Sequence, residues 1–310
     1  MIRSPMVKTC ELGRVFRLCA LAAAAMLAIL LPAYGQSYKY FRLGNAADAH
    51  TTPVRGYALM GGGSDLDEAF KWLCDRASGG DFLVLRAHGD DDYNPYIKGL
   101  CKANSVATLI LPDRAAAQDP KVAEIIGQAE AIFIAGGDQA NYLKFWADTP
   151  VQKEINDALA RGVPLGGTSA GLAVMGEFVY SAQGDAADDP DLASALALSN
   201  PFHPRVTVRR AFLNIPLLKN TLTDTHFKAR DRMGRTLTFL SRIVQDGWSA
   251  NPREIAVDEK AAVLLEPEGK ATVVGKSTVY FMRVTEAPAV CRANEPLTFC
   301  LLYTSPSPRD

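Results

Sequence analysis

The sequence has almost no excess of positive or negative charge, and it has no long hydrophobic run. The 33 basic and 34 acidic residues leave a formal net charge of −1, so the strongly basic balance typical of nucleic-acid-binding proteins is absent. The longest apolar run, residues 18–31, has about 14 residues, fewer than the about 20 that a membrane-spanning helix needs. The sequence therefore predicts no nucleic-acid partner and no stable membrane insertion of the mature chain.

Metal-binding and nucleotide-binding patterns are also missing. Outside the first 35 residues the cysteines are Cys74, Cys101, Cys291 and Cys300. Their spacing fits no zinc site, and it leaves open whether they form two disulfides in an oxidising compartment or stay as buried thiols. The glycines at 61–63 lack the spacing of a phosphate loop or a dinucleotide fingerprint and are interpreted as a tight turn. We predict no cofactor and no metal.

The two ends of the chain are interpreted as lying outside the domain. Four basic residues precede the run 18–31, and small residues follow it at Ala33 and Gly35. This order predicts a signal peptide over 1–35 and a secreted or periplasmic protein, with an uncleaved anchor as the alternative. Residues 36–54 are taken as an N-terminal connector. Residues 301–310 resemble translated adaptor sequence, so 300–310 is predicted to be a non-native tail.

Between these ends, residues 55–299 alternate short apolar runs with helical patterns. This order predicts an α/β fold with a doubly wound, mostly parallel sheet that has helices on both faces. The helix that follows residues 61–63 would be capped by Ser64 or Asp65. Strands are expected at residues 56–60, 82–87, 106–111, 131–135 and 163–166, and helices near residues 66–73, 121–129, 139–146 and 151–161.

After residue 181 the pattern loosens. The polar stretch 183–190 predicts a loop, with a lid as one interpretation. A helix is expected at 236–245, and the C-terminal part is predicted to be rich in strands, at 255–257, 262–265, 272–274 and 278–284.

The clearest sign of catalytic function is the sequence Gly-Thr-Ser-Ala-Gly at 167–171. They fit the G-x-S-x-G pattern, in which small neighbours allow a sharp turn that exposes a serine between a strand and a helix. An apolar stretch at 163–165 precedes the turn, and a run able to form a helix, 172–178, follows it. We interpret Ser169 as a nucleophile in such an elbow; a tight turn with Ser169 as a helix cap is the alternative.

A serine nucleophile needs a base and donors for the oxyanion. On the residues alone, His226 and His88 are both candidate bases. His226 stands out because Asp224 and several arginines surround it. Residues 136–139, which read Gly-Gly-Asp-Gln, directly follow a predicted buried strand, so their backbone amides could meet an oxyanion. A simple turn with an aspartate helix cap is the alternative.

Three of these segments resemble cyanophycinases. The segments are Phe-Ile-Ala-Gly-Gly-Asp-Gln at 133–139, the elbow at 167–171, and Asp-Thr-His-Phe at 224–227 with the arginines that follow it. The stretch Ile-Ala-Val-Asp-Glu at 255–259 is similar too, so the resemblance covers about residues 55–285. Cyanophycinases usually carry Gln where this chain has Thr225. The wider group includes aspartyl dipeptidases, and its fold is that of class I glutamine amidotransferases.

The resemblance implies a role for each matching residue. Ser169 would be the nucleophile, His226 the general base, and Glu259 the carboxylate that orients His226. The backbone amides of Gly137 and Ala170 would form the oxyanion hole. The substrate-binding residues would be Gln139, Asp224, Arg232 and Arg235.

The implied activity is that of a serine exopeptidase acting on aspartyl or isoaspartyl bonds of the β-Asp-Arg type. Its partner would be a small peptide or a cyanophycin-like substrate. An amidase on the same scaffold and a non-catalytic binding protein are the alternatives. Assembly into a homodimer stays open.

Overall fold

The computed structural model describes residues 37–184, 191–210 and 212–299, and the backbone of 304–306. The predicted signal peptide at 1–35, most of the predicted lid, Cys300 and most of the predicted tail lie outside these residues. Within the described part of the chain, the strands divide between two sheets.

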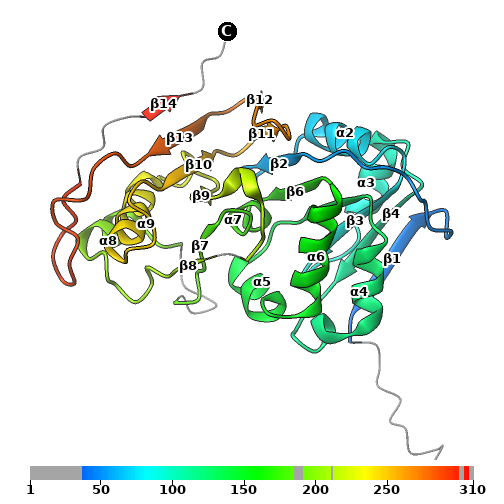
Figure 1. The fold of residues 1–310 in the computed structure, drawn as a ribbon, viewed down its shortest axis with the longest axis horizontal. Helices are drawn as coiled ribbons and strands as arrows, with labels where there is room; N and C mark the ends of the chain where they lie inside the picture. Colours follow the sequence, from blue (N-terminus) through cyan, green and yellow to red (C-terminus); the bar gives the residue numbers. More distant parts are fainter. Residues whose placement is uncertain (1–36, 185–190, 211, 300–303, 307–310) are drawn as a thin grey trace, which may run out of the picture. The chain divides into compact units, whose positions relative to one another are not determined.

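One mixed sheet carries the site (Figure 1). Its order is β1-β4-β3-β5-β6-β2-β11-β12. The strands from β4 to β2 in this order run parallel, whereas β1 pairs antiparallel at one side and β11 and β12 at the other. The predicted mostly parallel sheet is therefore confirmed. Its strands are β1 (Lys39–Gly44), β2 (Tyr57–Met60), β3 (Asp81–Arg86), β4 (Ser105–Ile110), β5 (Ala131–Ile134), β6 (Leu165–Thr168), β11 (Ala261–Leu265) and β12 (Ala271–Gly275).

Helices cover both faces of this sheet, as expected from the alternating pattern. Along β3, Leu83 and Leu85 belong to one apolar cluster with α4, α5 and α6, whereas Phe82 and Val84 belong to another with α2 and α3. Successive side chains of a strand point to opposite faces, so the two clusters are two separate layers of core. The helices are α2 (Asp67–Arg76), α3 (Tyr93–Leu100), α4 (Pro120–Gly127), α5 (Gln139–Trp146) and α6 (Pro150–Arg161), with a 3₁₀ turn η1 (Ala116–Gln118).

The helix ends follow local chemistry, with one correction. The side chain of Asp138 accepts a hydrogen bond from the Ala140 amide at the start of α5. Gly162 ends α6 with φ +94, a conformation that glycine adopts at little cost. The predicted cap of α2 by Ser64 or Asp65 is wrong: Leu66 holds the cap position, and no side chain caps the helix.

A second sheet of order β14-β13-β10-β9-β7-β8 follows the elbow. The C-terminal part is rich in strands, as predicted, but its strands divide between the two sheets. The helix expected at 172–178 is wrong, because α7 spans only four residues and Phe178 begins a strand. The elements are α7 (Ala170–Ala173), β7 (Phe178–Tyr180), α8 (Ser194–Ser199), β8 (Val208–Arg210), η2 (Pro216–Leu218), β9 (Thr221–Asp224), α9 (Met233–Gln245), β10 (Arg253–Val257), β13 (Val279–Arg283) and β14 (Thr304–Pro306).

Residues 39–44, which the sequence pattern assigned to the connector, form β1 and pair with β4 along its full length. The carboxylate of Asp81 stabilises this edge. It accepts hydrogen bonds from Arg42 at 3.0 Å and from the backbone amide of Ala49 at 3.0 Å. The connector is thus part of the sheet and not a linker beside it.

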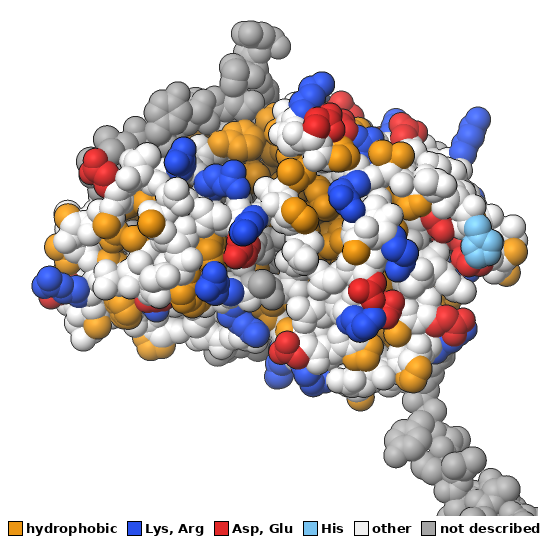
Figure 2. Space-filling model, in the orientation of Figure 1, with side chains coloured by type: hydrophobic (Ala, Val, Ile, Leu, Met, Phe, Trp, Pro, Cys, Tyr) orange, Lys and Arg blue, Asp and Glu red, His pale blue; other side chains and the backbone are white. Residues whose placement is uncertain are grey.

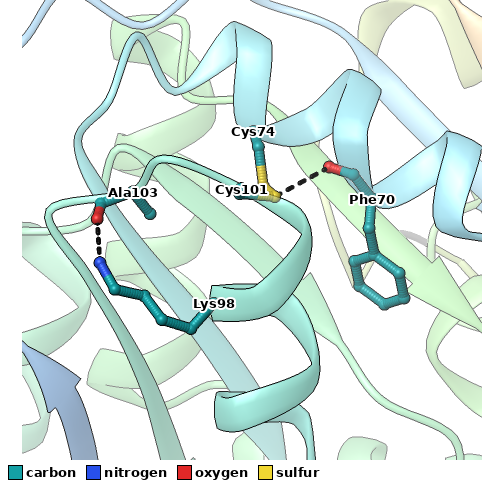
Figure 3. Close-up of a disulfide and its surroundings, with 5 residues drawn as sticks. All are labelled: Phe70, Cys74, Lys98, Cys101 and Ala103. Atoms are coloured by element: carbon teal, nitrogen blue, oxygen red, sulfur yellow. Dashed lines mark hydrogen bonds between the residues drawn. A yellow bond between two sulfur atoms is a disulfide. The ribbon is translucent and has the colours of Figure 1, made fainter.

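One disulfide joins two helices on the same face of the sheet. Cys74 on α2 bonds to Cys101, the residue that ends α3 (Figure 3). Closing a loop of 27 residues stabilises a folded chain by about 3.5 kcal/mol if the entropy of the unfolded state dominates. Cys291 is buried and has no disulfide partner among the residues that the structure describes.

The surface mixes both signs of charge. Over the face drawn in Figure 2, basic and acidic side chains are interspersed and form no continuous patch of one sign. In the described part of the chain, no helix has the length and apolarity needed to cross a membrane.

Candidate active site

The site lies where three neighbouring parallel strands end. Residues 61–63 follow β2, residues 136–137 follow β5, and Ser169 follows β6. Since β5, β6 and β2 are adjacent and parallel, their carboxyl ends meet at one edge of the sheet. In open α/β sheets, ligands bind at this edge.

Ser169 occupies a strained turn between β6 and α7. Its dihedral angles are φ +52 and ψ −121, a combination that residues other than glycine rarely adopt. A side chain at Gly167 would lie 2.6 Å from the backbone of Gly171, and one at Gly171 would overlap the carbonyl of Ile134. Both glycines of the motif are therefore required by close packing, as expected for an elbow that exposes a serine.

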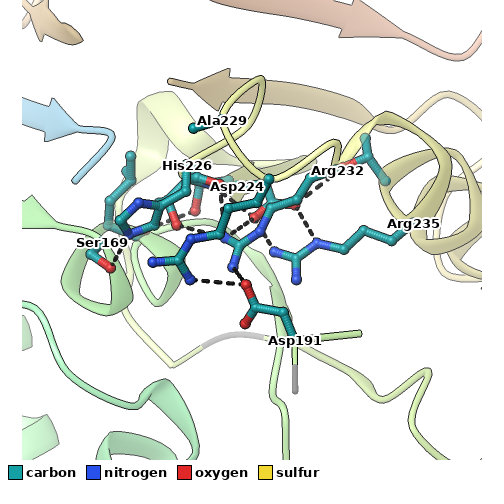
Figure 4. Close-up of polar contacts among 12 residues, drawn as sticks. Ser169, Asp191, Asp224, His226, Ala229, Arg232 and Arg235 are labelled. Carbon is teal, nitrogen blue, oxygen red and sulfur yellow. Dashed lines mark hydrogen bonds and ion pairs between the residues drawn. The ribbon is translucent and has the colours of Figure 1, made fainter. Parts of the chain in front are cut away.

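A line of hydrogen bonds connects Ser169, His226 and Glu259. The hydroxyl Oγ of Ser169 lies 2.6 Å from Nε2 of His226, and Nδ1 of His226 lies 2.7 Å from Oε1 of Glu259. We assign the proton to Nδ1, which then donates to the carboxyl oxygen of Glu259, so Nε2 accepts from the serine hydroxyl. Figure 4 shows the imidazole beside Ser169, on the loop that leaves β9. These are the three residues that the resemblance groups together.

The glycines at 61–63 hold the imidazole in place. The amide of His226 donates to the carbonyl of Gly61 at 2.8 Å. A side chain at Gly62 would meet the imidazole ring, and one at Gly63 would lie 3.1 Å from Oε2 of Glu259. Gly62 and Gly63 also have positive φ angles of +96 and +75. The tight turn predicted here therefore lines the same edge of the sheet.

The surroundings of His226 favour its neutral form. Burial lowers the pKa of His226, and the positive charges of Arg230 and Arg232 lower it further, while the hydrogen bond from its ring to Glu259 acts in the opposite direction. A neutral imidazole is the form that can accept a proton from Ser169.

The two residues predicted to donate to the oxyanion, Gly137 and Ala170, lie near the serine. Ala170 is the first residue of α7, so its amide has no acceptor within the helix. A Cβ added to Gly136 would lie 3.5 Å from Cβ of Ser169, which places the turn at 136–137 next to the nucleophile. Gly137 is exposed and has φ +154. Gln139, the first residue of α5, is half-buried beside this turn.

Asp224, Arg232 and Arg235 form a buried ionic cluster (Figure 4). Arg235 donates to both oxygens of Asp224, from Nε at 3.0 Å and from Nη2 at 2.5 Å, and only 2% and 4% of the two side chains is exposed. Arg232 donates to the carbonyl of Thr225 at 2.8 Å and lies 3.4 Å from Asp224. The carboxylate of Asp224 is thus occupied by arginines of this chain, and its role as a substrate contact stays a prediction.

The carboxyl group of Glu254 is linked to this cluster through Thr236. The hydroxyl of Thr236 is 3.2 Å from Asp224 and 3.1 Å from Glu254, so one side chain links both acids. Burial, and then repulsion by Asp224, raises the pKa of Glu254 well above its usual value. Although burial acts against it, the charges of Arg235 and Arg232 lower the pKa of Asp224. The two neighbouring acids therefore favour different protonation states.

Replacing Arg235 should reduce stability strongly. Arg235→Gln leaves the charge of Asp224 buried with only part of its compensation, and we expect a loss of about 3–5 kcal/mol in the free energy of unfolding. Arg230→Gln is the matched control: its pair with Asp191 is about half exposed and should change stability by less than about 1 kcal/mol. Urea titration followed by circular dichroism measures both. Equal stabilities of the two variants would contradict this account.

Part of the chain, including the elbow, is similar to a known protein family. Residues 91–214 match the model of Peptidase family S51. About two fifths of the chain are thus similar to this peptidase family. Ser169 lies within the matched residues, whereas His226 and Glu259 lie beyond them.

Curated relatives are similar to this chain in sequence, and a solved structure is similar to it in fold. A cyanophycinase from Geminocystis herdmanii is 31% identical over 180 residues, which are 57% of this chain and 58% of the relative. One from Trichormus variabilis is 29% identical over 208 residues, which are 63% of this chain and 60% of the relative. The chain thus spans about three fifths of the length of these relatives. A peptidase from an acI-B1 Actinobacterium, 18% identical, shares the fold with a TM-score of 0.52 over 76% of this chain and 96% of its own.

Asp191 is a residue near the site that sequence reasoning missed. Its Oδ2 lies 2.9 Å from Arg230 and 2.5 Å from Arg232, and about half of its side chain is exposed. Although burial acts against it, the charge of Arg232 and hydrogen bonds from both arginines lower the pKa of Asp191. No sequence pattern connects residues about 40 positions apart, so only the fold reveals this contact.

The other candidate histidine has different surroundings. His88 is exposed, and its ring meets that of Phe145 edge-on with centroids 6.3 Å apart. Among the described residues, no group of three or more His, Cys, Asp or Glu side chains is arranged to hold a metal ion.

Proposed function

We propose that this protein is a serine exopeptidase that hydrolyses aspartyl or isoaspartyl peptide bonds, of the β-Asp-Arg type, through an acyl-enzyme on Ser169. The observation that carries the proposal is the line of hydrogen bonds from Ser169 through His226 to Glu259. A serine in a strained elbow, a neutral imidazole and a carboxylate are the parts that nucleophilic attack requires. The name cyanophycinase of the curated relatives supports a peptide of this class.

Each residue has a defined task in this reaction. His226 takes the proton of Ser169 through Nε2 as the hydroxyl attacks the scissile carbonyl, and Glu259 stabilises the imidazolium that forms. His226 then gives the proton to the leaving amine. The amides of Gly137 and Ala170 donate to the oxyanion. Water completes the cycle by hydrolysing the acyl-serine, with His226 again as the base.

The arginines that contact Asp191 are proposed to bind the free carboxylate of the substrate. Arg230 and Arg232 both donate to one oxygen of Asp191, a half-exposed side chain of this chain. A substrate carboxylate would take the place of Asp191 and make the same charge-assisted hydrogen bonds. In this assignment Asp224 holds Arg232 in place and is itself bound by Arg235. Gln139 would contact the substrate beside the elbow.

The acidic limb of the pH profile of kcat/KM should reflect the titration of His226. Activity needs the neutral ring, so kcat/KM should rise as the pH rises through the pKa of His226, which lies below the ordinary 6.5. The midpoint of the acidic limb is therefore expected below pH 6.5. Arg230→Gln removes a nearby positive charge and should move this midpoint to higher pH. A midpoint above 6.5, unmoved by Arg230→Gln, would contradict the assignment of His226 as the base.

Paired substrates test the proposed carboxylate site. Arg232→Gln should cost about 1.5–3 kcal/mol in kcat/KM for a β-aspartyl peptide, because a charged hydrogen bond is lost. The penalty should shrink for the matched peptide whose free aspartyl carboxylate is an amide. Gln139→Ala is a control near the elbow that carries no charge and should not discriminate between the two peptides on the basis of charge. Equal penalties for Arg232→Gln on both peptides would mean that Arg232 maintains structure and does not bind the carboxylate.

A further inference from the structure

The carboxylate of Asp258 lies buried between the loop that carries His226 and the backbone of Glu259. Asp258 directly follows β10 and is 5% exposed. Its Oδ1 accepts hydrogen bonds from the backbone amides of Lys228 at 3.0 Å and Ala229 at 2.9 Å. Its Oδ2 accepts from the hydroxyl of Ser277 at 2.5 Å. The backbone amide of Glu259 also donates to this carboxylate.

These donors come from both sides of the His226–Glu259 hydrogen bond. Lys228 and Ala229 stand two and three residues after His226 in the loop that leaves β9, and the remaining amide belongs to Glu259 itself. Although burial acts against it, the hydrogen bonds from Ser277 and from the backbone amides lower the pKa of Asp258. The carboxylate is therefore ionised and binds two segments at once.

The His226 amide is bound to Gly61, and beyond that contact the direct backbone contact between the two segments that Asp258 connects is weak. The amide of Phe227 reaches the carbonyl of Val257 at 3.4 Å, a long hydrogen bond. The side chain of Glu259 is 32% exposed and contacts the imidazole through Oε1. His226 itself has a positive φ of +47, which a non-glycine residue adopts only where its surroundings enforce it. Asp258 therefore adds a second anchor close to His226, directly after the one at Gly61.

We propose that Asp258 is a positioning residue that fixes the distance between His226 and Glu259 by holding the histidine loop against the start of the segment that carries Glu259. The inference rests on the proposed function for its consequence in catalysis, because a misplacement of about 1 Å can cost about 10²-fold in rate. The structural part of the proposal is that Asp258 maintains the His226–Glu259 hydrogen bond. This part does not depend on which reaction the site catalyses.

The test variant is Asp258→Asn, which preserves the size of the side chain. An amide has one acceptor oxygen, so its NH₂ group faces either the two loop amides, which can only donate, or the side of the carboxylate that now accepts from Ser277. We expect kcat to fall about 10- to 100-fold with little change in KM. Ser277→Ala is the matched control: it removes one donor from Oδ2 and leaves the backbone amides of both segments bound, so kcat should change less than about 3-fold. If Asp258→Asn does not fold, Asp258→Glu, which shifts the oxygens by one methylene group, carries the same expectation.

A double-mutant cycle separates positioning from general support of the fold. If Asp258 acts through Glu259, Asp258→Asn should cost less than about 3-fold in kcat when Glu259→Gln is already present, because the two changes remove the same interaction. A full additional loss in that background, with both proteins folded, would overturn the proposal.

A measurement without substrate keeps this proposal distinct from the proposed function. NMR of protein with ¹⁵N-labelled histidine reports the Nδ1–H of His226, which should be downfield in the wild type and lost or shifted in Asp258→Asn and in Glu259→Gln. Arg230 and Arg232, the cations that also face His226, are unchanged in these variants. An unchanged Nδ1–H resonance in folded Asp258→Asn would overturn the proposal even if the peptidase activity is found. A lost resonance in a protein without activity on any aspartyl peptide would support it and refute the proposed function.

Discussion

Ser169→Ala is expected to lower kcat/KM about 10⁴-fold or more while the protein stays folded. Alanine has no oxygen to attack the scissile carbonyl, and His226 then has no hydroxyl proton to remove. Alanine differs from serine only by that oxygen, so the strained turn at φ +52 should persist. The measurement is initial-rate kinetics on an aspartyl peptide, with circular dichroism to verify folding.

Ser64→Ala is the matched control for this change. Ser64 is an exposed serine that follows the glycines at 61–63, at the same edge of the sheet. Its replacement should leave kcat/KM within about 3-fold of wild type, since surface hydroxyls away from the reacting atoms contribute little. A folded Ser169→Ala protein with turnover close to wild type would end the assignment of Ser169 as the nucleophile.

The second large effect concerns the choice between two histidines. His226→Ala should lower kcat/KM about 10⁴-fold or more, because it removes both the base and the acid of the proposed mechanism. His88→Ala should leave kcat/KM near wild type, because His88 is exposed and packs edge-on against Phe145. The same assay measures both variants. The reverse result, with His88 essential and His226 dispensable, would show that the contact between His226 and Ser169 has no catalytic role.

The parallel core of the fold could be predicted because its strands are buried on both faces. The stretch Ala-Ile-Phe-Ile of β5 is wholly buried and is followed by glycines, so an apolar run of strand length is recognisable in the sequence. β1 was not predicted, since it lies at the edge and its residues are mostly exposed or half-buried. α3 contains Pro95 and Gly99, which weaken a helical pattern, and was also missed.

The turn at 167–171 could be predicted because its residue types are set by the local backbone. The elbow glycines follow from the close contacts of Gly167 and Gly171, which any side chain would prevent. Partnerships across the chain are different. The sequence alone did not decide whether His226 or His88 is the base. The resemblance, not the spacing, grouped His226 with Glu259. The structure brings Ser169, His226 and Glu259 together, while their roles stay predictions.

The ionic contacts of the arginines could not be read from their spacing. Arg230, Arg232 and Arg235 fall within six positions of one segment, yet they meet different acids. Arg235 is buried on Asp224, whereas Arg230 reaches the half-exposed Asp191. Whether a charge faces solvent or a partner depends on which elements pack against it. Asp224 at the end of β9 lies 11 positions from Arg235, whereas Asp191 lies 39 positions from Arg230. The same holds for Asp258, whose partners lie on a loop about 30 positions earlier.

The central claim is that this chain hydrolyses bonds formed by aspartate, and a panel of substrates tests it most directly. Wild-type protein is incubated with β-aspartyl-arginine, α-aspartyl-arginine, their amide-capped analogues and cyanophycin, and the release of free amine is followed over time. The account predicts release from the β-aspartyl substrates first, with slower release from the amide-capped analogues. No release from any aspartyl substrate by folded protein, or equal release from charged and capped peptides, would contradict it.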